Sequence, residues 1–517
     1  MKSKFNKSAG YWIVTILLII AKLCAHILTN TNYELHRDEM LYFNMADHLS
    51  FGYATVPPVT GFLAFIIKTL FGYSVFGIRL LPAILGALSL FIIAKIIREL
   101  GGGIIALVIA GTSFLLSPGF LLVDTLFTPN VTEEFLWLLI TFCIFRMVKE
   151  DKPELWLLTG LLLGISFMNK YSVIFLIFGL FVALLLSNHR KLMSSRYFFL
   201  AIAIGLIIIL PNIVWQLNHG LPVISHMSEL KRTQLVNMNY SYFLEDILSL
   251  NLASVLIWMF GLIALLFFRD EKEYQYLGVA SFIIILLFLV LHGKAYYLMG
   301  IIPFLMAFGG YVMEKYLKGK LSWINYCVIP AVVAVSLAAL PGSLPILPFD
   351  KYSNYLDKTK NILIYPFLRW EDGKIHNISQ VYSDMTGWTE LAEYAAKAYN
   401  KLSGEEKKNC TIYAERNYGY AGAINFYGKK YNLPPPITFL ESYVFWAPDS
   451  IPDGPFIYIN SSADGLKDLF SEIIEEGCVD NRYFRENGLK VFLCKSPKVN
   501  IPELYKKIAK EEKNNYK

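Results

Sequence analysis

Charged residues are scarce in this sequence: Asp, Glu, Lys and Arg make up 17% of its 517 residues, against 55% hydrophobic residues. A soluble domain cannot bury so large an apolar share in one core, so an ordinary water-soluble protein is excluded. The net charge is +6, yet Lys and Arg are scattered among short polar breaks and form no basic stripe. That scatter argues against a nucleic-acid partner and is typical of residues that set membrane topology.

Several other signals are missing. The six cysteines show no CxxC spacing, so the spacing predicts no cysteine metal site. The small-x-small cleavage pattern after the first apolar run, residues 11–28, is poor, so we predict a retained helix rather than a cleaved signal peptide. The two halves of the chain do not resemble each other, and charges gather at one face rather than at mid-span, unlike the usual transporter pattern.

Long apolar runs are abundant. Most have about 16 to 22 residues, enough to cross roughly 30 Å of hydrocarbon as a helix. They predict a polytopic α-helical membrane protein with about eleven spans. The predicted spans are residues 11–29, 75–97, 104–121, 131–148, 154–169, 171–187, 198–215, 248–268, 276–292, 296–315 and 322–340.

Basic residues predict the orientation of these spans. They fall in alternate breaks, which the positive-inside rule places in the cytoplasm: Lys2, Lys4 and Lys7, Lys95 and Arg98, Arg146 and Lys149, Arg190 and Lys191, Arg269 and Lys272, and Lys315, Lys318 and Lys320. The long loops 30–74 and 216–247, and the chain after residue 341, are then extracytoplasmic. We therefore expect a multi-pass protein of the cell inner (plasma) membrane whose functional surface lies outside the cytoplasm.

The composition changes near Pro341, where three prolines precede a tail of ordinary charge density. This predicts two domains: a transmembrane domain, residues 1–341 including loop 30–74, and an extracytoplasmic domain, residues 342–517. In the tail, predicted strands at 378–383, 411–414, 437–440, 456–459 and 491–494 alternate with predicted helices at 388–402, 419–431 and 464–476, which favours a small α/β fold. Cys478 and Cys494 are the pair expected to form a disulfide, with Cys410 free.

The first long loop carries an unusual concentration of ionisable residues: His36, Arg37, Asp38 and Glu39 follow one another soon after the first span. An amphipathic stretch and a second apolar stretch, residues 59–70, follow, which favours a helix at the membrane interface. A lone acid pair is more often an ordinary solvated loop feature. Held at a membrane surface, such a pair is suited to catalysis on a lipid head group, which requires a base for the acceptor and cations for the departing phosphate.

Cations and phenols on the same predicted side complete the candidate site. Arg79 and Lys170 lie at outer ends of spans, where charge is costly unless paired or bound by a ligand, although snorkelling is the competing explanation. A short turn holds Lys294, Tyr296 and Tyr297 together. An aromatic belt with a snorkelling Lys would give the same pattern; the functional interpretation is a phosphate clamp.

Taken together, these segments resemble the family-39 glycosyltransferases, which include protein O-mannosyltransferases and the lipid A aminoarabinose transferase and share the GT-C fold. The resemblance spans the membrane region and parts of the tail. It is carried by HRDE at 36–39, HLSFGY to PP at 48–58, FGIRLLPA around Arg79, TPN at 128–130, NKY at 169–171, GKAYY at 293–297, and tail segments at 384–390, 418–427 and 434–436.

The resemblance implies roles for single residues. Asp38 takes the catalytic aspartate position and Glu39 is the adjacent acid, with His36 and Arg37 beside them. Arg79, Lys170 and Lys294 face the carrier phosphate, with Tyr296 and Tyr297 in the same turn as Lys294. Where many bacterial relatives have Thr-Pro-Asp, this chain has Asn130, an amide that can still bond sugar hydroxyls. The cofactor is left open between none and a divalent cation, and no metal ligand is predicted.

We therefore expect an integral-membrane glycosyltransferase that transfers a sugar from a polyprenyl-phosphate donor, with inversion, to an extracytoplasmic acceptor. The acceptor is a protein, lipid A or a glycan, and the sequence does not decide among them. The strongest alternative is a membrane transporter or flippase of lipid-linked substrates. A third is an inert anchor for a recognition module, which the joint presence of HRDE and GKAYY disfavours.

Overall fold

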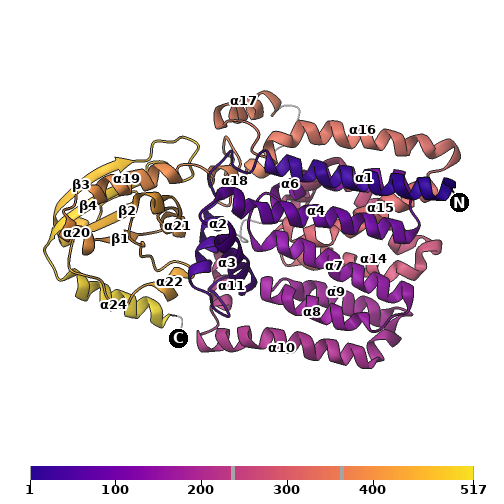
Figure 1. Ribbon diagram of the computed structural model, residues 1–517, viewed down its shortest axis with the longest axis horizontal. Coiled ribbons are helices and arrows are strands. Elements are labelled where there is room, and N and C mark those ends of the chain that lie inside the picture. Colours follow the sequence, from indigo (N-terminus) through magenta and orange to yellow (C-terminus); the bar gives the residue numbers. More distant parts are fainter. Residues whose placement is uncertain (1, 234–238, 361–365, 516–517) are drawn as a thin grey trace. The chain divides into compact units, whose positions relative to one another are not determined.

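The chain forms two compact units. The structure, a computed structural model, describes residues 2–233, 239–360 and 366–515 (Figure 1). The helical unit comprises residues 1–32, 79–212 and 230–377, and the α/β unit comprises residues 33–78, 213–229 and 378–517. The described residues between 342 and 377 thus pack with the helical unit, and most of the first long loop packs with the tail. The predicted division into domains 1–341 and 342–517 stays a prediction.

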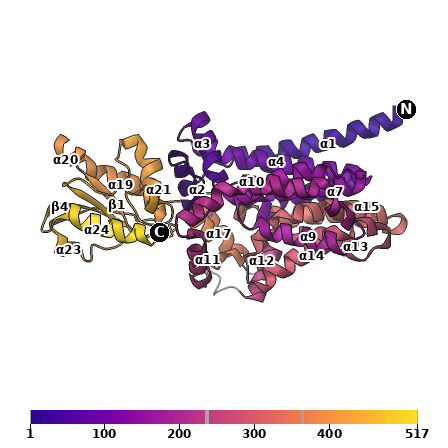
Figure 2. The ribbon, with the colours of Figure 1, turned by 90° about the horizontal axis from the view of Figure 1, so that it is seen from below.

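Helices make up the helical unit, and most of the long ones run along a common direction (Figures 1 and 2). Its elements are α1 (Lys2–Ile27), α4 (Val75–Leu100), α5 (Ile104–Leu116), α6 (Pro118–Val123), α7 (Pro129–Glu150), α8 (Leu155–Asn169), α9 (Val173–Leu186), α10 (Arg196–Asn218), α12 (Tyr240–Asn251), α13 (Val255–Phe267), α14 (Gln275–Val290), η6 (Ala295–Gly300), α15 (Ile302–Tyr316), α16 (Ser322–Ala339) and α17 (Phe349–Thr359).

Each predicted span falls on one or more of these helices. Among the described residues, six helical segments are long and apolar enough to cross a membrane: Ser8–Ile27, Val75–Leu100, Arg196–Asn218, Tyr240–Phe267, Arg269–Val290 and Gly319–Gly342. Shorter apolar helices include α5, α8 and α9. The chain is therefore a multi-pass helical membrane protein, and the count of about eleven spans stays a prediction.

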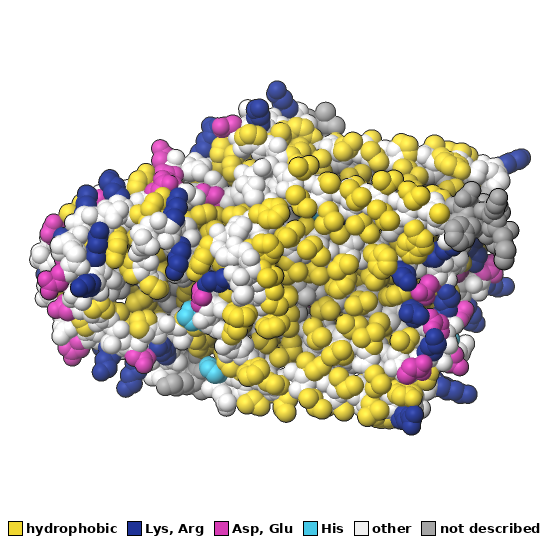
Figure 3. Space-filling model, viewed as in Figure 1, with side chains coloured by type: hydrophobic (Ala, Val, Ile, Leu, Met, Phe, Trp, Pro, Cys, Tyr) yellow, Lys and Arg dark blue, Asp and Glu magenta, His cyan; other side chains and the backbone are white. Residues whose placement is uncertain are grey.

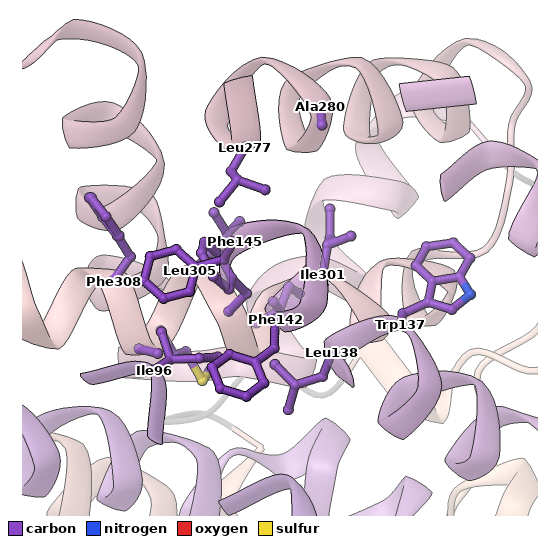
Figure 4. Packing of buried hydrophobic residues seen from close by; sticks show 14 of the residues in the cluster. Ile96, Trp137, Leu138, Phe142, Phe145, Leu277, Ala280, Ile301, Leu305 and Phe308 are labelled. Atoms are coloured by element: carbon purple, nitrogen blue, oxygen red, sulfur yellow. The ribbon is translucent and has the colours of Figure 1, made fainter. Parts of the chain in front are cut away.

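The core and the surface of the helical unit are both apolar, as a bilayer environment requires. In the core, Trp137, Phe142 and Phe145 of α7 pack among side chains of α4, α14 and α15 (Figure 4). The Phe145 ring lies 6.1 Å from that of Phe304. On the visible outer face, hydrophobic side chains cover the helices, and charged side chains gather at one end (Figure 3).

A buried ion pair interrupts this apolar interior. Lys22 Nζ of α1 lies 2.6 Å from Asp124 Oδ2, and neither side chain is exposed to solvent. Gly86 of α4 lies so close that a Cβ there would come within 2.4 Å of the same oxygen. Contrary to the expectation that charges stay at one face, this pair lies inside the helix bundle. It links α1 to the turn after α6, and α4 approaches the pair closely at Gly86.

The α/β unit contains α2 (Arg37–Asn44), η1 (Met45–Asp47) and α3 (Val59–Phe71) from the first loop, and part of α11 (Pro222–Thr233). The helix predicted at 59–70 is confirmed as α3. The tail supplies α18 (Gln380–Ser383), α19 (Trp388–Asn400), α20 (Gly404–Lys408), β1 (Thr411–Ala414), α21 (Tyr418–Phe426), η10 (Tyr427–Tyr431), α22 (Tyr443–Trp446), β2 (Phe456–Asn460), α23 (Leu466–Leu469), β3 (Phe470–Cys478), β4 (Lys490–Pro497) and α24 (Ile501–Asn514).

A four-stranded mixed sheet of order β1-β2-β4-β3 organises the tail. β1 and β2 are parallel, and β4 is antiparallel to both β2 and β3. Because side chains alternate along a strand, Phe492 and Cys494 point to the face where α24 packs, and Val491 and Leu493 point to the opposite face. The α19 helix contacts β3 and β4. The predicted α/β layering of the tail is thus observed.

Several predicted elements of the tail differ from the structure. The strand predicted at 378–383 is wrong, because Ser379 accepts a hydrogen bond from Tyr382 N and caps α18. At 437–440 only Ile437 makes an isolated bridge, with Tyr413. The helix predicted at 464–476 is a single turn, α23, followed by β3, because pairing with β4 overrides a helical apolar spacing.

The predicted disulfide is also wrong, since Cys478 and Cys494 are both free. In the register of β3 and β4, Cys478 lies opposite Lys490, whereas Cys494 lies opposite Ile473. Cys494 is thus four positions further along β4 than the residue facing Cys478. That offset is about 13 Å at roughly 3.3 Å per residue, beyond the reach of a disulfide.

Candidate functional site

The acid pair predicted from the sequence lies at the start of α2, and the two acids have different environments. His36 caps this helix: its Nδ1 accepts from Asp38 N at 3.1 Å, and Glu39 Oε2 accepts from His36 N at 2.9 Å. The Glu39 side chain is fully buried. Glu39 therefore holds the helix start through a capping box, while the Asp38 side chain remains 32% exposed.

Residues of the tail surround Asp38 within the α/β unit. The Tyr418 hydroxyl donates a hydrogen bond to Asp38 Oδ1. Arg37 lies over the Tyr418 ring at 5.6 Å, and its Nε is 3.8 Å from Asp38 Oδ1. Burial, with the Asp38 charge adding to it, raises the pKa of Tyr418 well above its usual value. Tyr418 therefore stays protonated and orients the Asp38 carboxylate.

A second aspartate organises the cations beside Asp38. Asp384 is fully buried, and its Oδ2 lies 3.0 Å from Arg485 Nη1, 3.4 Å from Arg37 Nε and 3.6 Å from His36 Nε2. A buried carboxylate is tolerated when it is paired and hydrogen-bonded in this way. Asp384 thus fixes His36 and Arg37, so that Asp38 remains the accessible acid of the group.

Glu441 is a member of this group that the sequence reasoning missed. Burial, and secondly the nearby Asp38 charge, raise the pKa of Glu441 to about 7. Its Oε2 is buried without a hydrogen-bond partner among the described residues. The backbone is left-handed there, with φ of 53°, a strained conformation for a glutamate. No local pattern signals this residue, because it reaches Asp38 only through the tertiary fold.

The first loop is anchored to the tail by specific bonds. Glu34 accepts hydrogen bonds from the backbone N–H groups of Trp388 at 2.7 Å and Thr389 at 3.2 Å, at the start of α19. A carboxylate is stabilising at a helix N-terminus. Gly422 of α21 lies against α2, where a Cβ would come within 2.8 Å of the Met40 side chain. These contacts explain why the acid-bearing loop belongs to the α/β unit.

The cation cluster, defined as Lys170, Lys294, Asn130, Tyr296 and Tyr297 with their acidic partners, lies in the helical unit. Lys170 Nζ donates to Asn130 Oδ1 at 2.8 Å and to Glu133 Oε2 at 2.7 Å. It lies 4.4 Å from the Tyr297 ring centre and 5.6 Å from that of Tyr296. The structure therefore brings Lys170 together with Asn130, 40 positions before it, and with Tyr297, 127 positions after it.

Lys294 belongs to the same cluster. Both Lys170 and Lys294 interact electrostatically with the Tyr297 hydroxyl, and Lys294 Nζ also lies 2.9 Å from Glu371 Oε1. Glu133 and Glu371 were not predicted. Glu133 had a detectable signal, because it stands three positions after Asn130 on α7 and such residues share a helix face.

Arg79 has a more enclosed position than predicted for a phosphate ligand. It is fully buried, and its Nη1 donates to the backbone oxygen of Asn30 at 2.7 Å. This bond satisfies a carbonyl just beyond the end of α1. In the described part of the chain, no group of three or more His, Cys, Asp and Glu side chains is arranged to hold a metal ion.

The geometry thus supplies an accessible carboxylate in one unit and paired, hydrogen-bonded lysines in the other. An accessible carboxylate suits proton transfer. Lysines held by carboxylates and phenols suit an anionic oxygen ligand, which can displace or share these partners.

The fold is the GT-C fold of membrane glycosyltransferases. The crystal structure of ArnT from Cupriavidus metallidurans bound to undecaprenyl phosphate superposes with a TM-score of 0.64 at 14% identity, over 93% of this chain and 98% of that one. The oligosaccharyltransferase of Archaeoglobus fulgidus matches with a TM-score of 0.51 at 13% identity, over 84% of this chain and 64% of that one. At such identities the likeness shows the fold alone.

Sequence comparison agrees with the resemblance to family-39 glycosyltransferases. The family described as dolichyl-phosphate-mannose-protein mannosyltransferase matches residues 55–215. Lipid A galacturonosyltransferase RgtD of Rhizobium johnstonii is 25% identical over 209 residues, which is 40% of this chain and 44% of that relative. The matched region therefore spans less than half the length of the curated relative.

Proposed function

We propose that this protein is an integral-membrane glycosyltransferase that uses a polyprenyl-phosphate sugar as donor. The observation that carries the proposal is the accessible Asp38 carboxylate held by Tyr418 at the start of α2. The fold and the family segment support the class of enzyme. Because ArnT was crystallised with undecaprenyl phosphate and RgtD acts on lipid A, a lipid-linked donor and a lipid A or related glycan acceptor are the first substrates to test.

In the proposed reaction, Asp38 takes the proton from an acceptor hydroxyl. The acceptor oxygen then forms a bond to the anomeric carbon of the sugar, and the bond from that carbon to the phosphate oxygen breaks. The electron pair of the broken bond leaves with the polyprenyl phosphate. A single displacement of this kind inverts the anomeric centre.

The other residues around Asp38 hold it in position for this step. Glu39 and His36 hold the helix start, and Asp384 holds Arg37 beside the carboxylate. Lys170 and Lys294 neutralise the phosphate of the departing carrier, and Asn130 bonds sugar hydroxyls. Arg79 binds the Asn30 carbonyl beyond the end of α1, and its contact with the carrier phosphate stays a prediction. We place this chemistry on the extracytoplasmic side of the inner membrane, as the distribution of basic residues predicts.

The proposed function is tested with the purified full-length protein and a panel of polyprenyl-phosphate sugars. Each donor is incubated with lipid A, a glycan or a hydroxyl-bearing peptide, and the released carrier and the product are identified by mass spectrometry. We expect release of free polyprenyl phosphate with a matching mass gain on one acceptor. Translocation of intact donor across vesicles with no release of carrier would instead identify a flippase.

Lys170→Met should weaken binding of polyprenyl phosphate about 10- to 100-fold, because a hydrogen bond to a charged group contributes roughly 1.5–3 kcal/mol. Native mass spectrometry with added undecaprenyl phosphate measures this. Lys315 offers a matched control: it pairs with Glu271 at 2.6 Å and lies 5.4 and 5.2 Å from two tyrosine rings. Lys315→Met, in a break predicted to be cytoplasmic, should leave carrier binding unchanged, and equal losses in both variants would contradict a specific phosphate site.

A further inference from the structure

A cavity of about 670 Å³ with both apolar and polar walls lies in the α/β unit and is not used by the proposed chemistry. Its volume falls in the range of small-molecule sites, about 300–1,000 Å³. The walls come from the end of α2 and η1, from α21 and η10, and from the segments on both sides of α22. Asp38 is not among the described residues that line it, so the cavity is separate from the acid group.

One wall is aromatic and rigid. The rings of His48 and Trp446 are stacked, with centroids 4.4 Å apart and an interplanar angle of 10°. Tyr443 meets the Trp446 ring edge-on at 5.0 Å. Burial lowers the pKa of His48, so its ring is neutral at neutral pH and stacks without a charge. Such a wall can pack against the apolar face of a ring-shaped ligand.

A second wall holds fixed hydrogen-bonding groups. Asn44 Nδ2 donates to the buried Tyr443 hydroxyl at 2.5 Å, and the Asn425 side chain also bonds that hydroxyl. Both amides line the cavity together with Thr438. Because one bond of each amide is already fixed, its remaining donors and acceptors have a set direction. This arrangement suits a ligand with several hydroxyl groups.

The rim of the cavity has an excess positive charge. Asp47 is neutralised by Lys68, whose Nζ lies 2.5 Å from Asp47 Oδ1. Lys429 is exposed and lies 5.7 Å from the Tyr73 ring. None of the described carboxylates forms an ion pair with Lys429. An acidic group on the ligand would find its partner there.

We propose that this cavity binds a saccharide that carries an acidic substituent, a carboxylate or a phosphate. The aromatic wall takes the face of the sugar ring, the amide wall takes its hydroxyls, and Lys429 takes the acidic group. Asn44 and Asp38 lie six positions apart on α2, about 9 Å at roughly 1.5 Å per residue. The bound saccharide is then part of the acceptor, a step that rests on the proposed function, whereas binding itself does not.

Saturation-transfer NMR with the detergent-solubilised full chain tests the proposal. The probes are chitobiose, glucuronic acid, N-acetylglucosamine 1-phosphate and inorganic phosphate. We expect saturation transfer to the two acidic sugars and a weaker signal for chitobiose. Inorganic phosphate at equal concentration should not compete with the acidic sugars. Competition by inorganic phosphate as strong as that by the phosphosugar would show an anion site only and overturn the proposal, and so would the absence of any saccharide signal.

Variants then locate the site. Lys429→Met should weaken binding of the acidic sugars about 10- to 100-fold, as expected for a charged hydrogen bond, and leave chitobiose binding unchanged. The neighbouring Lys430, which pairs with Glu393 at 3.9 Å and does not line the cavity, provides the matched control Lys430→Met. Asp38→Asn should bind every probe normally, so failure of the saccharide site and failure of the proposed catalysis are distinguished. Equal effects of the two lysine variants would overturn the assignment to this cavity.

Discussion

Asp38→Asn should lower the rate of sugar transfer about 10²- to 10⁴-fold, the usual cost of losing a general base. Asparagine has the same shape as aspartate and can still accept the hydrogen bond from Tyr418, but it cannot take the acceptor proton. Turnover, carrier binding and the unfolding temperature should be measured on the same preparation. We expect only turnover to fall, because removing a group that acts only in the transition state lowers kcat and leaves substrate binding unchanged.

Glu39→Gln is the matched control for this prediction. Glutamine can accept the same bond from His36 N, since a capping box works with either residue, so transfer should remain within a few-fold of the native rate. Near-normal turnover in Asp38→Asn would refute the role of Asp38. Retention of the anomeric configuration in the product would point instead to a covalent glycosyl-enzyme intermediate.

Local sequence was sufficient for the apolar helices of the helical unit and for the hydrogen bonds between His36 and Glu39 at the start of α2. Apolar run length predicts these helices because a bilayer leaves few alternatives to a helix. The HRDE run encodes its own capping box, so the start of α2 depends on neighbours only. By contrast, β3 was missed because its apolar residues, Phe470, Ile473 and Ile474, have a helical spacing, and only pairing with β4 decides between the two forms.

The environment of the candidate site could not be read from local sequence. Asp384, Tyr418, Glu441 and Arg485 stand hundreds of positions after Asp38, and each reaches the acid group through packing of α2 on the tail. In the helical unit the family motifs pointed to Lys170 and Asn130, but not to Glu133, which also accepts a hydrogen bond from Lys170. The resemblance predicted residues that contact substrate, and the structure adds the residues that hold them in place.

The Lys22–Asp124 pair also could not be predicted from local sequence, because nothing in the residues around either one indicates its partner. Lys22→Met should lower the free energy of unfolding by about 3–5 kcal/mol, the usual cost of leaving one buried charge unpaired. Asp124 would lose its ammonium partner in a bundle where both side chains are fully enclosed. Thermal unfolding of the detergent-solubilised protein should therefore show a lower midpoint. Lys95→Met, at a less enclosed position on α4, should change the free energy by no more than about 0.5 kcal/mol.

The double variant Lys22→Met/Asp124→Leu tests whether the loss of stability comes from the unpaired Asp124 carboxylate. Leucine keeps the branching of aspartate without its charge, so the paired removal leaves no unpaired charge of the original two. We expect the double variant to recover most of the lost stability, since replacing a buried ion pair by apolar residues is often neutral.

If Lys22→Met alone leaves the midpoint unchanged, Asp124 must be neutral in the folded protein. If the double variant is as unstable as the single one, the ammonium is required for another partner, and Glu134 of α7, which also interacts electrostatically with Lys22, is the residue to change next.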